Sequence, residues 1–127
     1  MSELDRMRNP NEGAGAVAVL LYITVGLFLW GLHLTIVYAA HTAICALAAA
    51  PAAATVTIAA VTVLLALPLA AILFNQRRFA RLLGIGETVT EPRIYDAISF
   101  FVNLLSLVGI LWSGLAVAML SSCILAR

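Results

Sequence analysis

The stretch Ala14–Ala46, AGAVAVLLYITVGLFLWGLHLTIVYAAHTAICA, decides the fold. No Asp, Glu, Lys or Arg occurs between Gly13 and Gln76. A helix over this stretch, rising about 1.5 Å per residue, is longer than a hydrocarbon core of roughly 30 Å requires. The sequence therefore predicts a first transmembrane helix that tilts or extends beyond the membrane.

The composition of the whole chain also indicates a membrane protein. Of the 127 residues, 64% are hydrophobic and only 10% are charged, with a mean hydropathy of +1.09. A soluble domain would carry about 25% charged residues, so lipid must solvate most of this surface. Net charge is only +1 and the positive side chains are all arginines, which makes nucleic acid a poor candidate partner.

Two further apolar stretches complete an all-α prediction of three transmembrane helices, over about 14–46, 55–74 and 97–125. They form one transmembrane domain, 14–127, after a polar tail, 1–13. Pro51 should break the chain in a tight turn, and Pro68 should kink the second helix because proline removes a backbone hydrogen bond. Residues 75–96 form the long loop, with Thr90 as a candidate N-cap and Pro92 in the first turn of the third helix.

The arginines predict the orientation. Loop 75–96 holds four of the seven positive residues and the tail holds two, whereas the 46–54 turn has none. Cytoplasmic loops carry the excess of positive charge, so we expect the N-terminus and the long loop inside and the C-terminus outside. Arg127 alone opposes this. The expected location is a bacterial inner (cytoplasmic) membrane, with a multi-pass topology.

The two cysteines would then share one face of the membrane. Cys45 and Cys123 each lie at the outer end of a span, on the oxidising side of a bacterial membrane. We predict a Cys45–Cys123 disulfide; two small buried thiols are the alternative. His41 lies four residues before Cys45 and shares its helix face, so His41, Cys45 and Cys123 could instead ligate copper or zinc, which a disulfide would exclude.

His33 lies near the middle of the first span, where an ionisable side chain must face protein or a cavity. One interpretation is an axial haem ligand. His41 is eight residues away, so the two histidines cannot ligate one iron, and a second ligand would come from a partner. The other interpretation is a neutral ring hydrogen-bonded across helices to a hydroxyl.

Several residues are candidates for helix packing. Trp30 and Trp112 lie inside spans rather than at their ends, which is typical of packing anchors. The small residues Gly114, Ala118 and Ser122 recur every four positions and would let another helix approach closely. That helix could be the first span or belong to another subunit. Asn103 should be buried against protein.

Arg77, Arg78 and Arg81 form a basic patch at the end of the second span. Such a patch normally sets topology and contacts anionic lipid headgroups. Docking to an acidic surface of a larger complex is the alternative. The spans contain no acid–base pair and the chain shows no catalytic triad or phosphate loop, so we expect neither an ion transporter nor an enzyme.

The pattern Trp30-Gly31-Leu32-His33, followed by Tyr38 and Cys45, resembles the first helix of small three-span proteins associated with bacterial haem-copper terminal oxidases. Trp112 and Cys123 match the last helix of that group. His41 and the long arginine-bearing loop depart from it. The resemblance implies a structural subunit or assembly helper of the respiratory chain and gives no assured role to His33.

The sequence thus favours a non-catalytic accessory subunit of a respiratory membrane complex, with other integral membrane subunits and lipids as partners and no cofactor of its own. The alternative is a haem- or copper-binding protein for electron transfer or for cofactor delivery and assembly. A homo-oligomer built on the Gly114 face is a third hypothesis.

Overall fold

The computed structural model describes residues 10–48, 50–85 and 92–119, and every element in them is helical. The helices are α2 (Pro10–Leu47), α3 (Pro51–Phe74), α4 (Gln76–Leu82) and α5 (Pro92–Met119). Within this part of the chain, α2, α3 and α5 contain segments of 33, 24 and 24 residues that are long and apolar enough to cross a membrane. The prediction of an all-α membrane protein with three spans is confirmed.

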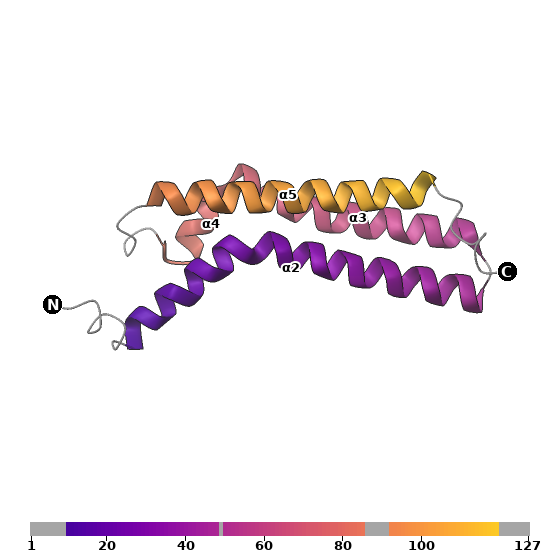
Figure 1. Cartoon of the computed structure of the whole chain (residues 1–127), viewed down its shortest axis with the longest axis horizontal. Coiled ribbons are helices and arrows are strands. Elements are labelled where there is room, and N and C mark those ends of the chain that lie inside the picture. The colour runs from indigo at the N-terminus through magenta and orange to yellow at the C-terminus, as the bar shows by residue number, and fades with distance from the viewer. Residues whose placement is uncertain (1–9, 49, 86–91, 120–127) are drawn as a thin grey trace.

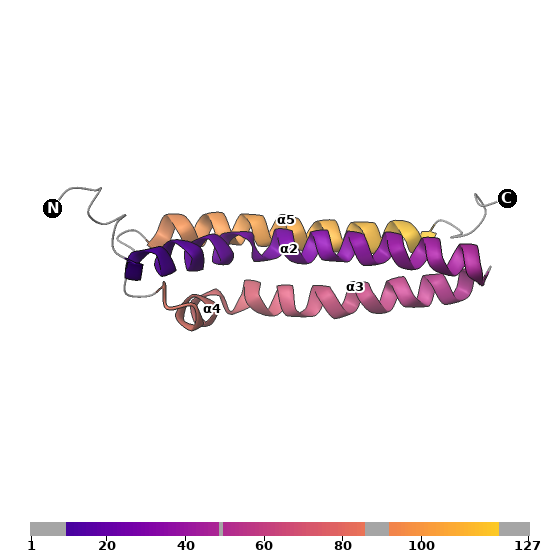
Figure 2. The ribbon, with the colours of Figure 1, turned by 90° about the horizontal axis from the view of Figure 1, so that it is seen from below.

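The three long helices form one bundle in which each contacts the other two. α2 and α5 run in the same direction, and α3 runs in the opposite direction beside both, so Pro10 and Met119 lie at opposite ends (Figure 1). The short helix α4 crosses the bundle axis at the end where α3 finishes, and it is seen end-on in Figure 2. The first and third spans therefore lie side by side, as expected.

The helices begin earlier than the apolar pattern indicates, and prolines explain why. α3 starts at Pro51 and α5 at Pro92, rather than near residues 55 and 97. Proline suits the first helical position because its missing N–H has no partner there in any case. α2 likewise includes Pro10, and α3 continues through Pro68 to Phe74. The predicted end of the third span, 120–125, and the Thr90 cap lie outside the described residues.

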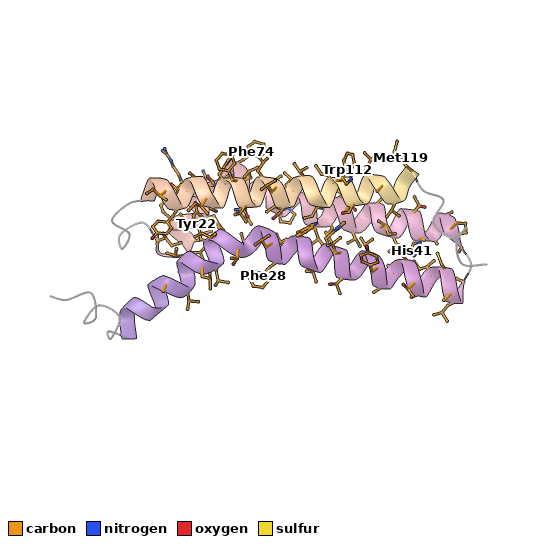
Figure 3. The ribbon with its side chains drawn as sticks, viewed as in Figure 1. Tyr22, Phe28, His41, Phe74, Trp112 and Met119 are labelled. Atoms are coloured by element: carbon orange, nitrogen blue, oxygen red, sulfur yellow. The ribbon has the colours of Figure 1, made fainter. Side chains whose placement is uncertain are left out.

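The interior of the bundle is more polar than its surface. His33, Thr62, Ser99, Asn103 and Ser106 are buried, whereas large apolar side chains cover the outside. Figure 3 shows Trp112 and Met119 on the outer side of α5 and Phe28 on the outer side of α2. Water would favour the opposite arrangement, whereas in lipid the polar groups must be satisfied within the protein.

Helix α2 bends along the stretch between Tyr22 and Phe28 (Figures 1 and 3). In this stretch Ser99 Oγ of α5 donates a hydrogen bond of 2.9 Å to the Tyr22 carbonyl oxygen. Thr24 Oγ1 also donates to the carbonyl oxygen of Leu20, four residues earlier, at 2.7 Å. Side chains that enter the backbone hydrogen-bond ladder bend helices. Thr35 and Thr42 of α2 make the same bond as Thr24, so the bond from Ser99 of α5 is the feature that distinguishes this stretch.

Helix α4 is a feature that the sequence analysis assigned to a loop. Asn75 separates it from α3, and its Phe79 ring stacks on Tyr22 of α2 with ring centroids 6.0 Å apart. Tyr22 is 1% exposed. Since a seven-residue helix is marginal alone, this packing is what holds α4 against the end of the bundle.

Candidate functional site

The centre of the bundle is organised around His33. Its side chain is fully buried on α2. Nε2 lies 3.0 Å from Thr62 Oγ1 on α3, and Nδ1 lies 3.3 Å from Ser113 Oγ on α5. One imidazole thus links all three spans, which confirms the interpretation of a histidine hydrogen-bonded across helices to hydroxyls.

Both hydroxyl partners of His33 are also hydrogen-bonded to their own helices. Thr62 Oγ1 donates to the Ile58 carbonyl oxygen at 2.8 Å. Ser113 Oγ donates to the Gly109 carbonyl oxygen at 2.8 Å and lies 3.0 Å from the Ile110 carbonyl oxygen. A neutral imidazole has one N–H donor and one acceptor nitrogen. His33 therefore donates to one of the two hydroxyls, and the other hydroxyl donates to the ring in place of its backbone carbonyl.

Two glycines of α5 bring the helices close enough for these bonds. A β-carbon at Gly114 would lie 2.6 Å from both the hydroxyl oxygen and the methyl carbon of Thr62. A β-carbon at Gly109 would lie 2.9 Å from the indole nitrogen of Trp30. Small residues permit such approach between transmembrane helices. Gly114 therefore faces α3, which is neither of the two neighbours expected from the sequence, and Trp30 packs on α5.

A second polar cluster lies nearer the α4 end of the bundle. The Tyr22 hydroxyl donates to Asp96 Oδ1 of α5 at 2.8 Å. Asn103 Nδ2 donates to Ser99 Oγ at 3.1 Å, and Ser99 in turn reaches the Tyr22 carbonyl oxygen. Asn103 is fully buried, as expected. The cluster links α2 to α5 through both the side chain and the backbone of Tyr22.

The amide oxygen of Asn103 is buried without a hydrogen-bond donor among the described residues. A β-carbon on Gly26 would clash with this oxygen, which therefore faces the Cα–H of that glycine. Cα–H···O contacts of this kind recur where transmembrane helices touch and offset part of the missing hydrogen bond. Gly26 is buried and allows α5 to lie directly on α2 at this point.

The other predicted residues are less central. Trp112 is 72% exposed on the outer side of α5, so it does not pack between the helices of this chain. His41 and Cys45 lie one turn apart on α2, but Cys123 lies outside the described residues, so the disulfide and the metal site both stay predictions. Ser122 also lies outside, and for Ala118 only the helical backbone is described.

Sequence reasoning singled out Asn103 on α5 but missed the polar seam to which it belongs, which we define as Asp96, Ser99, Asn103, Ser106 and Ser113. The first four of these residues are three or four positions apart. Ser113 follows Ser106 after seven positions, with Ile110 between them. This spacing places all of them on one helix face. Within an otherwise apolar helix, such a polar stripe marks the side that faces protein, and it was visible in the sequence.

No family model, curated protein or solved structure matches this chain. Its function must therefore be argued from these contacts. The interior side chains hold hydrogen bonds between helices, and within the described residues no group of three His, Cys, Asp or Glu side chains is placed to hold a metal ion. The described side chains therefore hold α2, α3 and α5 in a fixed arrangement through hydrogen bonds between the helices.

Proposed function

We propose that this chain is a non-catalytic accessory subunit of a larger membrane complex. The observation that carries the proposal is that His33 is engaged in hydrogen bonds between the helices. His33 is fully buried in the bundle interior, and both of its ring nitrogens are within hydrogen-bond distance of hydroxyls from the other two helices. A residue committed in this way stabilises the arrangement of the spans.

The outer surface supports a role among other membrane subunits. Phe28, Tyr38, Leu105 and Trp112 are between 66% and 72% exposed, and they come from two different helices. A bundle of only three spans covers little of its own apolar surface. Aromatic side chains are the residues that most often anchor protein interfaces, so Trp112 and Phe28 are the positions at which we place contacts with neighbouring subunits.

The resemblance of Trp30, His33, Tyr38 and Cys45 to small oxidase-associated proteins supplies the class of complex. We propose a bacterial haem-copper terminal oxidase or a supercomplex that contains one. The distribution of arginines supports an orientation with the N-terminus and α4 on the cytoplasmic side of the inner membrane. In this orientation α4 lies at the cytoplasmic surface.

The test uses the tagged full-length chain, extracted from its native membrane in mild detergent. Co-purifying proteins are identified by mass spectrometry, and reduced-minus-oxidised spectra are recorded for the complex and for the separated small chain. We expect stoichiometric large oxidase subunits that carry the haems, and a colourless small chain. A small chain that purifies alone with a haem or metal signal would overturn the proposal.

Crosslinking locates the contact. A photoreactive phenylalanine derivative in place of Trp112, and separately in place of Phe28, reports on two outer faces of the bundle. The same derivative in place of the fully buried Ile110 is the control, because it can reach only this chain. Crosslinks to a larger subunit from at least one outer position are expected. If neither outer position captures a subunit, the placement of the subunit contacts at Trp112 and Phe28 is wrong.

A further inference from the structure

The outward side of α4 differs in charge from the apolar outer surfaces of the three long helices. Arg77, Arg78 and Arg81 are all exposed there. Phe74, the last residue of α3, and Leu82, the last residue of α4, flank the arginines in the sequence and are each 84% exposed. We call these five residues the α4 basic surface. It combines three permanent positive charges with two large apolar side chains at the end of a membrane span.

The charges of this surface have no counter-charge within the described protein. Arg81 Nε donates to the Arg77 carbonyl oxygen at 3.3 Å, which leaves the rest of its guanidinium available. Asp96, the acidic residue packed at this end of the bundle, accepts a hydrogen bond from Tyr22 on the inner side. Among the described residues no ion pair involves any of the three arginines, so the α4 basic surface is set up to receive an external anion.

The orientation of α4 places this surface in the membrane interface. The helix crosses the bundle axis (Figure 2), and its Phe79 packs inward on Tyr22, which turns the arginines outward. A helix with an apolar side and an arginine-bearing side, lying across the end of a span, has the arrangement of interfacial helices that bind lipid. Phe74 is the last residue of the apolar helix α3.

We propose that the α4 basic surface binds the headgroup of an anionic phospholipid. The guanidinium groups would hold the phosphate, for which their planar fork of donors is suited. Phe74 and Leu82 would contact the first carbons of the acyl chains. A headgroup with acyl chains attached matches both the charges and the two apolar side chains, whereas a free anion matches the charges alone, so the surface fits lipid. The inference is independent of the proposed function and of which side of the membrane α4 occupies.

The test measures binding of phosphatidylglycerol and of phosphatidylcholine to the purified full chain in neutral detergent, by native mass spectrometry. Each arginine near an anionic membrane surface is worth about fivefold in affinity. We therefore expect Arg77→Gln/Arg78→Gln/Arg81→Gln to weaken phosphatidylglycerol binding on the order of 100-fold and to leave phosphatidylcholine binding unchanged. Arg78→Gln alone, which keeps the Arg81–Arg77 contact, should lose about fivefold.

A matched variant, Arg6→Gln/Arg8→Gln/Arg127→Gln, removes the same number of positive charges elsewhere in the chain. It should bind phosphatidylglycerol as the unmodified chain does. Equal losses in the two triple variants, or equal binding of both lipids to the unmodified chain, would overturn the proposal. Inorganic phosphate at the same concentration should not displace the lipid; displacement would show a site for free anions instead.

Discussion

The contact between Gly26 and Asn103 gives a sharp test of how the bundle is held together. In Gly26→Ala the new β-carbon would lie 3.0 Å from both the Asn103 α-carbon and Ser106 Oγ, and closer still to the Asn103 amide oxygen. The α-carbon cannot rotate away as a flexible side chain can. Helices α2 and α5 must therefore separate at this point, which also strains the hydrogen bond from Ser99 to the Tyr22 carbonyl oxygen.

Gly31→Ala is the matched control. Gly31 lies in the same helix, but no described atom comes within 4 Å of its would-be β-carbon. Both substitutions gain about 1 kcal/mol of helix propensity, so this gain cancels when the two variants are compared. The remaining difference is the cost of overpacking, about 1–3 kcal/mol. Gly26→Ala should be less stable than Gly31→Ala by that amount.

The free energy of unfolding can be measured by titrating the protein in detergent micelles with sodium dodecyl sulfate and following tryptophan fluorescence. Trp30 lies against Gly109 of α5, so its emission reports separation of the two helices. A difference of about 1–3 kcal/mol corresponds to roughly 5- to 150-fold in the folded-to-unfolded ratio. Equal stability of the two alanine variants would refute the close packing of α2 on α5 at Gly26.

Two further predictions use the same preparation. Thr62→Val keeps the shape of the side chain but removes the hydroxyl that is hydrogen-bonded to His33. It should lower the free energy of unfolding by about 0.6 kcal/mol and at most about 1.7 kcal/mol. A stability equal to that of the unmodified chain would show that the bond contributes nothing. Non-reducing mass spectrometry of the native protein should find Cys45 and Cys123 joined; alkylation of both thiols without prior reduction would end the disulfide prediction.

The sequence could predict the three spans and the burial of His33 and Asn103, because the cost of a polar group in lipid admits few alternatives. It could not predict that His33 bonds to Thr62 and Ser113. That pairing depends on the relative register of three helices, and a single helix's periodicity carries no information about its neighbours. For the same reason Gly114 was assigned to contacts with α2 or another subunit, whereas it packs on α3.

Helix α4 was missed for a different reason. Its seven residues include three arginines and lie between two long apolar stretches, so the segment has the composition of a loop. Local propensity cannot stabilise so short a helix. What stabilises it is the contact of Phe79 with Tyr22, two residues 57 positions apart in the sequence. A tertiary contact of that kind becomes visible only in the folded chain.

The polar contacts around His33 and the polar cluster around Tyr22 together explain how a bundle with an apolar exterior can have a single arrangement in lipid. Apolar side chains gain no hydrophobic free energy from leaving lipid for each other, so the polar contacts add to close packing in fixing how far one helix slides along another. Asp96 and Ser113 are separated by about 25 Å along α5 at about 1.5 Å per residue. Asp96 contacts Tyr22 of α2, and Ser113 contacts His33 of α2. A slip of one helical turn, about 5.4 Å, would break both contacts at once and leave their polar atoms unpaired in the bundle. The interior contacts therefore set the register of the helices. Outer side chains such as Phe28 and Trp112 are not needed for this and can contact lipid or a neighbouring subunit.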